Sequence, residues 1–148
     1  MQLNKDIVRG MKRAAKLGMT YCVRLNGTSD IPWERLGIMQ QFPNVQFYDY
    51  TKSPERMTRF VNGEMPKNYH LTFSRSETNG AISLAFLRSG GNVAMVFRKY
   101  LPETFKGFPV IDGDETDLRF LDGKGKIVGL KEKGLAKKDE TGFVLEPA

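Results

Sequence analysis

Four short apolar segments recur along the chain at equal spacing. They are YCVRL, VQFYDY, YHLTF and VAMVF, with central residues Val23, Phe47, Leu71 and Met95. Successive central residues lie 24 positions apart. Each segment is rich in the β-branched, aromatic and other apolar side chains that favour strands. The pattern therefore predicts four strands separated by connections of equal length.

The connections between these segments carry the signals of helix ends. Ser29 or Asp30 precedes Pro32 in the first connection, and Ser53 precedes Pro54 in the second. Ser and Asp are favoured N-caps, and proline suits the first turn of a helix. A glycine pair ends the third connection, as is typical of a helix C-terminus. Each connection is therefore expected to contain a helix.

Strands that alternate with helices at this short period are typical of right-handed βαβ units. The sequence predicts an α/β fold in which repeated βα units form a mostly parallel sheet or half of a (β/α)8 barrel. Beyond residue 100, LRFLD and KIVGL flank GKG, which predicts a C-terminal antiparallel β hairpin. A further strand, GFVLE, is expected to extend the sheet. We expect one domain over residues 1–148: a basic helix at about 4–18, βα repeats at about 20–100 and a β-rich part at about 108–146.

In either arrangement, ligands bind beyond the carboxyl ends of the parallel strands. Polar side chains cluster at these points in successive units. The candidate ligand-binding residues are Arg24, Asn26, Asp49, Lys52, Arg75 and Glu77. Helix capping and solvation are the alternative explanation for this cluster.

An acidic stretch between residues 112 and 122 contains five carboxylates. Asp112 and Asp114 alternate as on one face of an extended segment, and Mg²⁺ prefers such oxygen ligands. Asp112, Asp114 and Asp117, with Lys131, are the candidate catalytic residues of a Mg²⁺-dependent nuclease or phosphoesterase. The alternative is a solvated turn whose charges pair with neighbouring basic side chains, with Asp117 and Arg119 as a local pair.

The chain of 148 residues carries a net charge of +6, which favours phosphate-rich partners. In the N-terminal helix, one stripe is basic: Lys5, Arg9, Lys12, Arg13 and Lys16. This stripe is a candidate nucleic-acid surface. A charged face that only keeps an amphipathic helix soluble is the alternative.

The chain has one cysteine, Cys22, and one histidine, His70. They cannot form a structural zinc or iron–sulfur site, so any metal should be bound by oxygen. Cys22 is expected to be buried and inert, and His70 to have a packing role. No segment reaches the roughly 18 apolar residues of a membrane span, so a soluble, cytoplasmic protein is expected.

The motifs RLNGTSDIPWE, FYDYTK, LTFSRSE, DGDETDLRFLD and IVGLKEKG resemble the gene-product-88-like family of uncharacterised phage and mobile-element proteins. The resemblance implies a phage or plasmid context, and therefore the cytoplasm of a bacterial host as the location. It also implies a further function class, a counter-defence or host-takeover protein that binds a host protein. Binding of nucleic acid or another phosphate-bearing ligand is the first expectation from the residues, and the Mg²⁺-dependent nuclease is an alternative. The sequence does not define the oligomeric state.

Overall fold

The computed structural model describes all residues from Met1 to Ala148. The helices are α1 (Gln2–Leu17), α2 (Ile38–Gln41), α3 (Pro54–Val61) and α4 (Gly80–Arg88), with short 3-10 segments η1 (Trp33–Leu36), η2 (Arg119–Leu121) and η3 (Gly134–Lys138). The strands are β1 (Cys22–Val23), β2 (Gln46–Thr51), β3 (Tyr69–Ser74), β4 (Asn92–Phe97), β5 (Thr104–Phe105), β6 (Phe108–Asp112), β7 (Ile127–Lys131) and β8 (Val144–Leu145). The four predicted strands and the long N-terminal helix are therefore confirmed.

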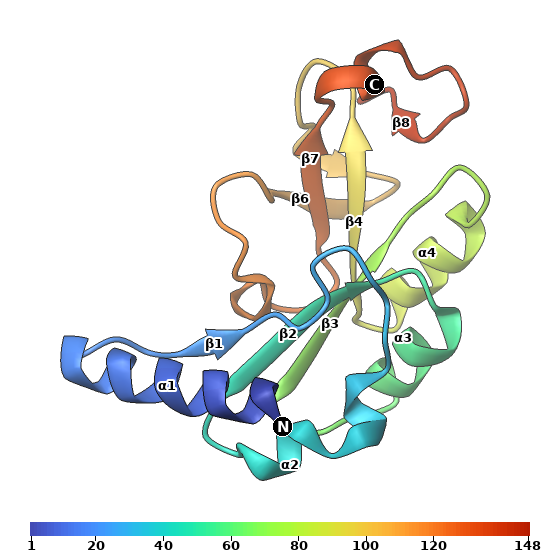
Figure 1. Ribbon diagram of the computed structural model, residues 1–148. Helices are drawn as coiled ribbons and strands as arrows, with labels where there is room; N and C mark the ends of the chain where they lie inside the picture. Colours follow the sequence, from blue (N-terminus) through green and yellow to red (C-terminus); the bar gives the residue numbers. More distant parts are fainter.

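The strands form one sheet in the order β1-β2-β3-β4-β7-β6-β5 (Figure 1). All neighbouring pairs in this order are parallel except β5 and β6. The short β8 pairs with Val96 and Phe97 at the end of β4, beyond the residues of β4 that pair with β3. The predicted α/β class with a mostly parallel sheet is confirmed, and the sheet is open rather than closed into a barrel.

The C-terminal antiparallel hairpin exists, but at a different place from the one that the sequence suggested. It is formed by β5 and β6 around Lys106 and Gly107, which both have positive φ angles. The segment LRFLD instead forms η2, and KIVGL forms β7, which lies parallel between β4 and β6. The predicted placement was wrong because two apolar runs joined by a glycine turn are typical of a hairpin. Tertiary contacts with β4 and β6 instead make the second run a parallel strand.

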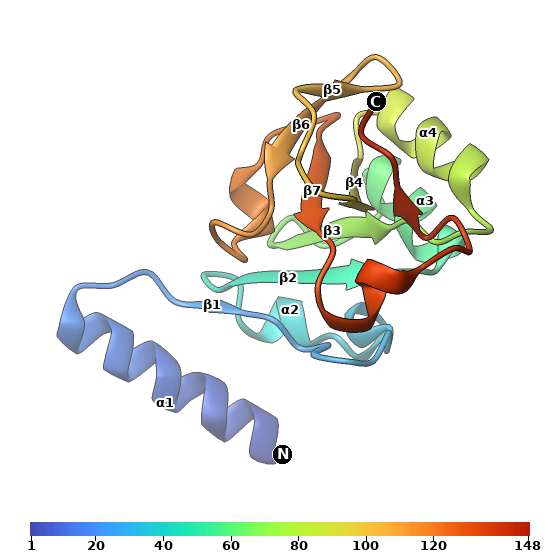
Figure 2. The same cartoon turned by 90° about the horizontal axis from the view of Figure 1, so that it is seen from above.

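The repeat of apolar segments corresponds to residues on one face of the sheet. The strand register places Phe47, Leu71 and Met95 on the same face, and all three are buried. Met57 of α3 and Phe86 of α4 belong to the same core cluster. These helices cover that face of the sheet, while η2 lies against the other one (Figures 1 and 2).

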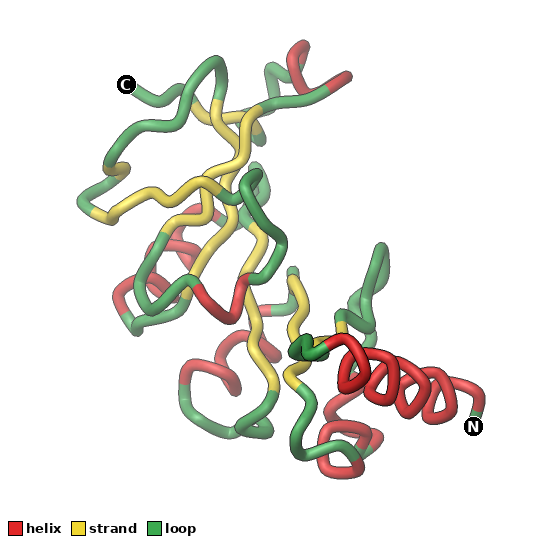
Figure 3. Tube along the Cα trace, turned by 90° about the vertical axis from the view of Figure 1, so that its left-hand side faces the viewer, coloured by secondary structure: helices red, strands yellow, loops and turns green.

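Helix α1 lies at the β1 end of the sheet, apart from α3 and α4 (Figure 2). Ile7 anchors it in the core, and Gly10 allows the ring of Tyr21 to pack directly against its backbone. Figure 3 shows that this helix and the C-terminus lie at opposite ends of the molecule. No helix of the structure combines the length and apolar character that a membrane crossing requires.

The first helical connection differs from its sequence signals. Pro32 is the N-cap of η1, and Gly37, with a positive φ of 73°, separates η1 from α2. Neither Ser29 nor Asp30 caps this helix, because the Asp30 carboxylate instead accepts hydrogen bonds from Thr51 and the backbone of Lys52. Ser53 caps α3 as predicted, by accepting from the backbone N–H of Arg56.

The replacement Gly129→Ala is expected to destabilise the protein. Gly129 lies in the middle of β7, and a Cβ there would lie 2.7 Å from Val110 Cγ1 and 3.0 Å from Leu101 Cδ2. Overpacking at such a site typically costs about 1–3 kcal/mol, and urea denaturation would measure the loss. Gly80→Ala is the control, because its Cβ meets no atom within 4 Å and alanine favours the start of α4. Equal stability of the two variants would contradict the packing described for β7.

Candidate functional site

The parallel strands end at the same edge of the sheet, which we call the carboxyl edge. Two adjoining hollows lie there, with volumes of about 530 and 300 Å³, and both are lined by Arg24, Tyr50 and Ser74. The larger hollow is further lined by Ala94, Gly113, Asp114, Thr116, Asp117 and Leu130. The smaller one is further lined by the loop from Asn26 to Asp30, with Thr51 and Lys52. The structure thus brings the acidic stretch and the predicted ligand-binding residues Arg24, Asn26 and Lys52 together at one edge.

Arg24 joins the two hollows. Its guanidinium donates to the carbonyl oxygens of Asn26 and Gly27, and its Nη1 donates to Asp117 Oδ2 at 3.1 Å. It also lies over the ring of Tyr50, with 4.9 Å between Cζ and the ring centroid. The Tyr50 hydroxyl faces Asp117 Oδ1 at 3.4 Å, and burial raises the pKa of Tyr50 to about 12. Arg24 therefore fixes both the loop after β1 and the acidic stretch.

Two buried residues, Asn26 and Asp49, fix the loop after β1 from the interior of the protein. Asp49 accepts hydrogen bonds from the backbone N–H and the side-chain amide of Asn26. The Asn26 side-chain oxygen accepts in turn from Ser29, Trp33 and the backbone of Ile31. These two residues were predicted to bind a ligand, but they are 2 % and 0 % exposed and instead position the loop.

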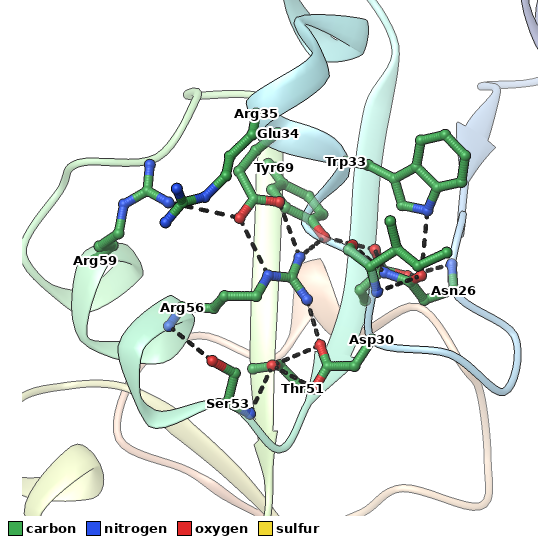
Figure 4. A network of polar contacts seen from close by, with 12 residues as sticks. Asn26, Asp30, Trp33, Glu34, Arg35, Thr51, Ser53, Arg56, Arg59 and Tyr69 are labelled. Atoms are coloured by element: carbon green, nitrogen blue, oxygen red, sulfur yellow. Dashed lines mark hydrogen bonds and ion pairs between the residues drawn. The ribbon is translucent and has the colours of Figure 1, made fainter.

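The same network continues across the core side of the edge (Figure 4). Tyr69 donates to Asp49 Oδ2 at 2.5 Å, and Arg56 Nη2 donates to the Tyr69 hydroxyl at 2.6 Å. Arg56 also forms a two-point pair with Glu34 and an ion pair with Asp30. Burial raises the pKa of Asp49 above its usual value, although its hydrogen bonds with Tyr69 and Asn26 oppose this shift. The carboxylate of Asp49 and the guanidinium of Arg56 thus connect the loop after β1 to β2, β3 and α3.

The rim of the smaller hollow carries donors that have no partner. The backbone N–H groups of Gly27, Thr28 and Ser29 donate to no atom of the chain. Lys52, which lines the same hollow, is exposed and forms no ion pair. Successive free amides beside a cation are the groups that proteins use to bind anions.

The carboxylates of the acidic stretch are mostly occupied by basic partners. Asp114 accepts from Lys133 Nζ at 2.6 Å and from the Lys131 backbone at 3.1 Å. Burial opposes ionisation of Asp114, but these bonds hold its pKa below the usual value. Asp112 is exposed and accepts only from the backbone of Asp114. No group of three or more His, Cys, Asp or Glu is placed to hold a metal ion, so the predicted Mg²⁺ site at Asp112 and Asp114 gains no support.

Arg119 holds the acidic stretch against the sheet, although the sequence did not single it out as a site residue. It is fully buried, donates to the carbonyl of Thr116 and pairs with Asp122 at 3.3 Å. The sequence suggested a local pair between Arg119 and Asp117 as the solvated alternative. That pairing is wrong, because Asp117 pairs with Arg24 of the β1 loop instead.

The remaining predicted residues lie outside the two hollows. Arg75 donates to the carbonyls of Gly142 and Phe143 and thereby fixes the segment before β8. Arg98 holds the same segment through Glu146 and the carbonyl of Asp139. Glu77 is exposed in the next loop. The five basic residues of the α1 stripe are all exposed: Lys5, Arg9, Lys12, Arg13 and Lys16.

His70 and Cys22 lie away from the carboxyl edge. His70 packs edge-on against Phe60, with ring centroids 5.2 Å apart, and lines a third hollow at the amino ends of β3 and β4. Burial, and secondarily the charge of Arg119, lowers its pKa to about 4. The thiol of Cys22 is half-buried and free, and burial raises its pKa, so it is a poor nucleophile.

Comparison with known proteins gives one match. The model of the family described as Gene product 88 matches residues 1–147. No curated protein and no solved structure shows significant similarity to the chain.

Replacement of Arg56 by methionine is expected to lower the free energy of unfolding by about 3–5 kcal/mol. The cause is the Glu34 carboxylate, whose side chain is 1 % exposed and would lose its two-point partner. Arg35→Met is the matched control, because Arg35 pairs with Glu55 at the surface and such pairs contribute about 1 kcal/mol or less. Urea denaturation of both variants measures the difference. A loss below about 1 kcal/mol in Arg56→Met would contradict the role of this network.

The pKa of His70 is expected to lie well below the usual value for histidine. NMR signals of the only histidine should titrate with a midpoint near pH 4, well below the value of about 6.5 for an unfolded chain. Since the unfolded state binds the proton first, the stability from neutral His70 is present above about pH 6.5 and is lost as the pH falls towards 4. His70→Gln should therefore lose less stability than the parent between pH 7 and 5. A midpoint near 6.5 would show that the ring is solvated.

Proposed function

The chain belongs to the Gene product 88 family, and we propose that it binds a phosphate-bearing ligand at the carboxyl edge, with a nucleic-acid strand as the first form to test. One observation carries the proposal. The loop from Gly27 to Ser29 presents three unpaired backbone N–H groups beside the unpaired ammonium of Lys52. Such a set of donors suits the oxygens of a phosphate.

The rigidity of this loop supports the proposal. Loop amides that bind an anion lose affinity if the loop must first be ordered. Here Asn26 and Arg24 fix the loop, and Asp49 fixes Asn26. The donors are therefore held in place before a ligand arrives.

The larger hollow suits the remainder of a nucleotide. It adjoins the loop through Arg24, Tyr50 and Ser74, and it also contains the apolar surface of Ala94 and Leu130. Aromatic and apolar surfaces bind bases without strict sequence preference, and hydroxyls can bind their polar edges. A phosphate at the loop with a nucleoside in the larger hollow is consistent with both sets of lining residues.

The exposed basic stripe of α1 favours a nucleic-acid strand over a free nucleotide. All five of its cations face solvent, and only Arg9 forms an ion pair, with Asp6 at 3.6 Å. An extended polyanion gains from several such cations through counterion release, whereas a mononucleotide does not.

A Mg²⁺-dependent nuclease has weaker support. Asp114 and Asp117 do line the larger hollow, as that mechanism requires. However, Lys133 pairs with Asp114, and Arg24 pairs with Asp117, so a metal ion would have to displace both cations. The host-binding alternative rests on the phage resemblance alone.

The proposal predicts salt-dependent binding that requires Lys52. Labelled single-stranded DNA and RNA, titrated by fluorescence anisotropy, should bind more weakly as salt increases. Lys52→Gln should weaken binding about tenfold, as expected when a charge-assisted hydrogen bond to phosphate is lost. Lys67→Gln makes the same charge change at an exposed position before β3 and should leave affinity within about twofold. The indole N–H of Trp33, which donates to Asn26, should shift in NMR spectra when the loop is occupied.

Other outcomes separate the alternatives. Equal weakening by Lys52→Gln and Lys67→Gln would show that the binding is only nonspecific electrostatic attraction. Cleavage of the strands in Mg²⁺, abolished by EDTA and by Asp117→Asn, would favour the nuclease. Absence of both binding and cleavage would reject both and direct the search to host proteins.

A further inference from the structure

We infer a second ligand site, at the amino ends of β3 and β4, that takes a small planar aromatic acid. The cavity there has a volume of about 460 Å³, which is within the usual range for small-molecule sites. Its lining includes Phe60, His70, Asn92, Phe120, Gly123 and Lys124. None of these residues lines either hollow of the carboxyl edge, so the inference does not rest on the function proposed above.

The wall of this amino-edge cavity is fixed by Asn92, which is 2 % exposed. Its side-chain amide donates to the carbonyl of Gly123 at 2.8 Å, and its oxygen accepts from the backbone of Lys126 at 2.8 Å. The backbone N–H of Gly125 donates to the carbonyl of Gly90 on the facing turn. These bonds join the turn after η2 to the turn after α4, so the cavity is formed before any ligand enters.

Aromatic rings make one side of the cavity. Phe60 of α3 and Phe120 of η2 line it, and His70 packs edge-on against Phe60 at 5.2 Å. Tyr48, on the neighbouring strand, holds Phe120 in place with ring centroids 5.5 Å apart. Such a set of rings favours a planar aromatic guest through offset or edge-to-face contacts.

His70 adds a polar group to this aromatic wall. Its Nδ1 is buried without a partner, while Nε2 is not among the fully buried atoms. The Nε2 atom forms no hydrogen bond within the chain, so it is the imidazole atom that a polar substituent on a ring-shaped ligand can reach from the cavity.

The ammonium of Lys124 and two backbone N–H groups favour a ligand that carries a carboxylate. Lys124 is exposed and forms no ion pair, and the backbone N–H groups of Gly123 and Lys124 donate to no atom of the chain. No aspartate or glutamate lines the cavity. A carboxylate attached to the ring would receive the Lys124 ammonium and these amides, while the ring lies between Phe60 and Phe120.

The experiment uses the only histidine and the only tryptophan as separate reporters. The intact protein is titrated with indole-3-acetate while the imidazole signals of His70 and the indole N–H of Trp33 are followed by NMR. Saturable shifts of His70 with an unchanged Trp33 are expected, because His70 lines the cavity and Trp33 belongs to the carboxyl-edge loop. The neutral amide of the same compound should bind about tenfold more weakly, since it lacks the charge-assisted contact.

Matched variants test the assignment. Lys124→Gln should weaken indole-3-acetate about tenfold, whereas Lys106→Gln, in the β5–β6 turn outside the cavity lining, should leave it within about twofold. His70 signals that do not move at about 1 mM acid would overturn the inference. Equal binding of the acid and the amide, or a shift of Trp33 alone, would overturn it as well. A phosphate ligand that moves only Trp33 tests the carboxyl edge separately, so either site can fail without the other.

Discussion

The buried carboxylate of Asp49 is the constraint on which the carboxyl edge depends. A charge without solvent is costly unless hydrogen bonds surround it, so Asp49 requires Asn26 and Tyr69 at fixed positions. Tyr69 in turn requires Arg56, whose guanidinium is neutralised by Glu34 and Asp30. The loop after β1 is therefore not a free surface loop. Hydrogen bonds to the protein interior fix the shape of this loop, so its three unpaired backbone amides are held in place.

The two edges of the sheet differ in how they are built. The carboxyl edge is open, and its arginines and carboxylates largely neutralise one another, which leaves Lys52 and the loop amides as the unpaired donors of the smaller hollow. The amino edge has a more enclosed cavity lined by aromatic rings, with Lys124 as its cation. An open site suits part of a long ligand, whereas the more enclosed one suits a whole small molecule. The two proposed sites of this α/β sheet therefore differ in the kind of ligand that suits them.

Much of the fold could be predicted from local pattern, because each βα unit repeats its own signals. The strands around Val23, Phe47, Leu71 and Met95 and the cap at Ser53 follow from residues close in sequence. The position of β7 could not be predicted, because its neighbours β4 and β6 are chosen by packing. At the carboxyl edge, the strand-end rule pointed to Arg24 and Lys52, which line the hollows there. It did not distinguish inward from outward polar residues, so Asn26 and Asp49 were assigned to the ligand and Arg56, Tyr69 and Arg119 were missed. A polar residue between apolar neighbours, as in FYDY, was the available signal for a buried carboxylate.

The strand order has a consequence for how the chain folds during synthesis. The ribosome delivers β6 before β7, yet β7 must enter between β4 and β6, and β8 joins β4 later still. A nascent chain that ends before residue 127 therefore has β4 with one side unpaired and a β5–β6 hairpin without a neighbouring strand. Exposed edges of this kind promote wrong pairing. Insertion of β7 into the middle of the sheet is thus a late step of folding, which depends on long-range contacts and should be slow relative to the formation of the first βα units.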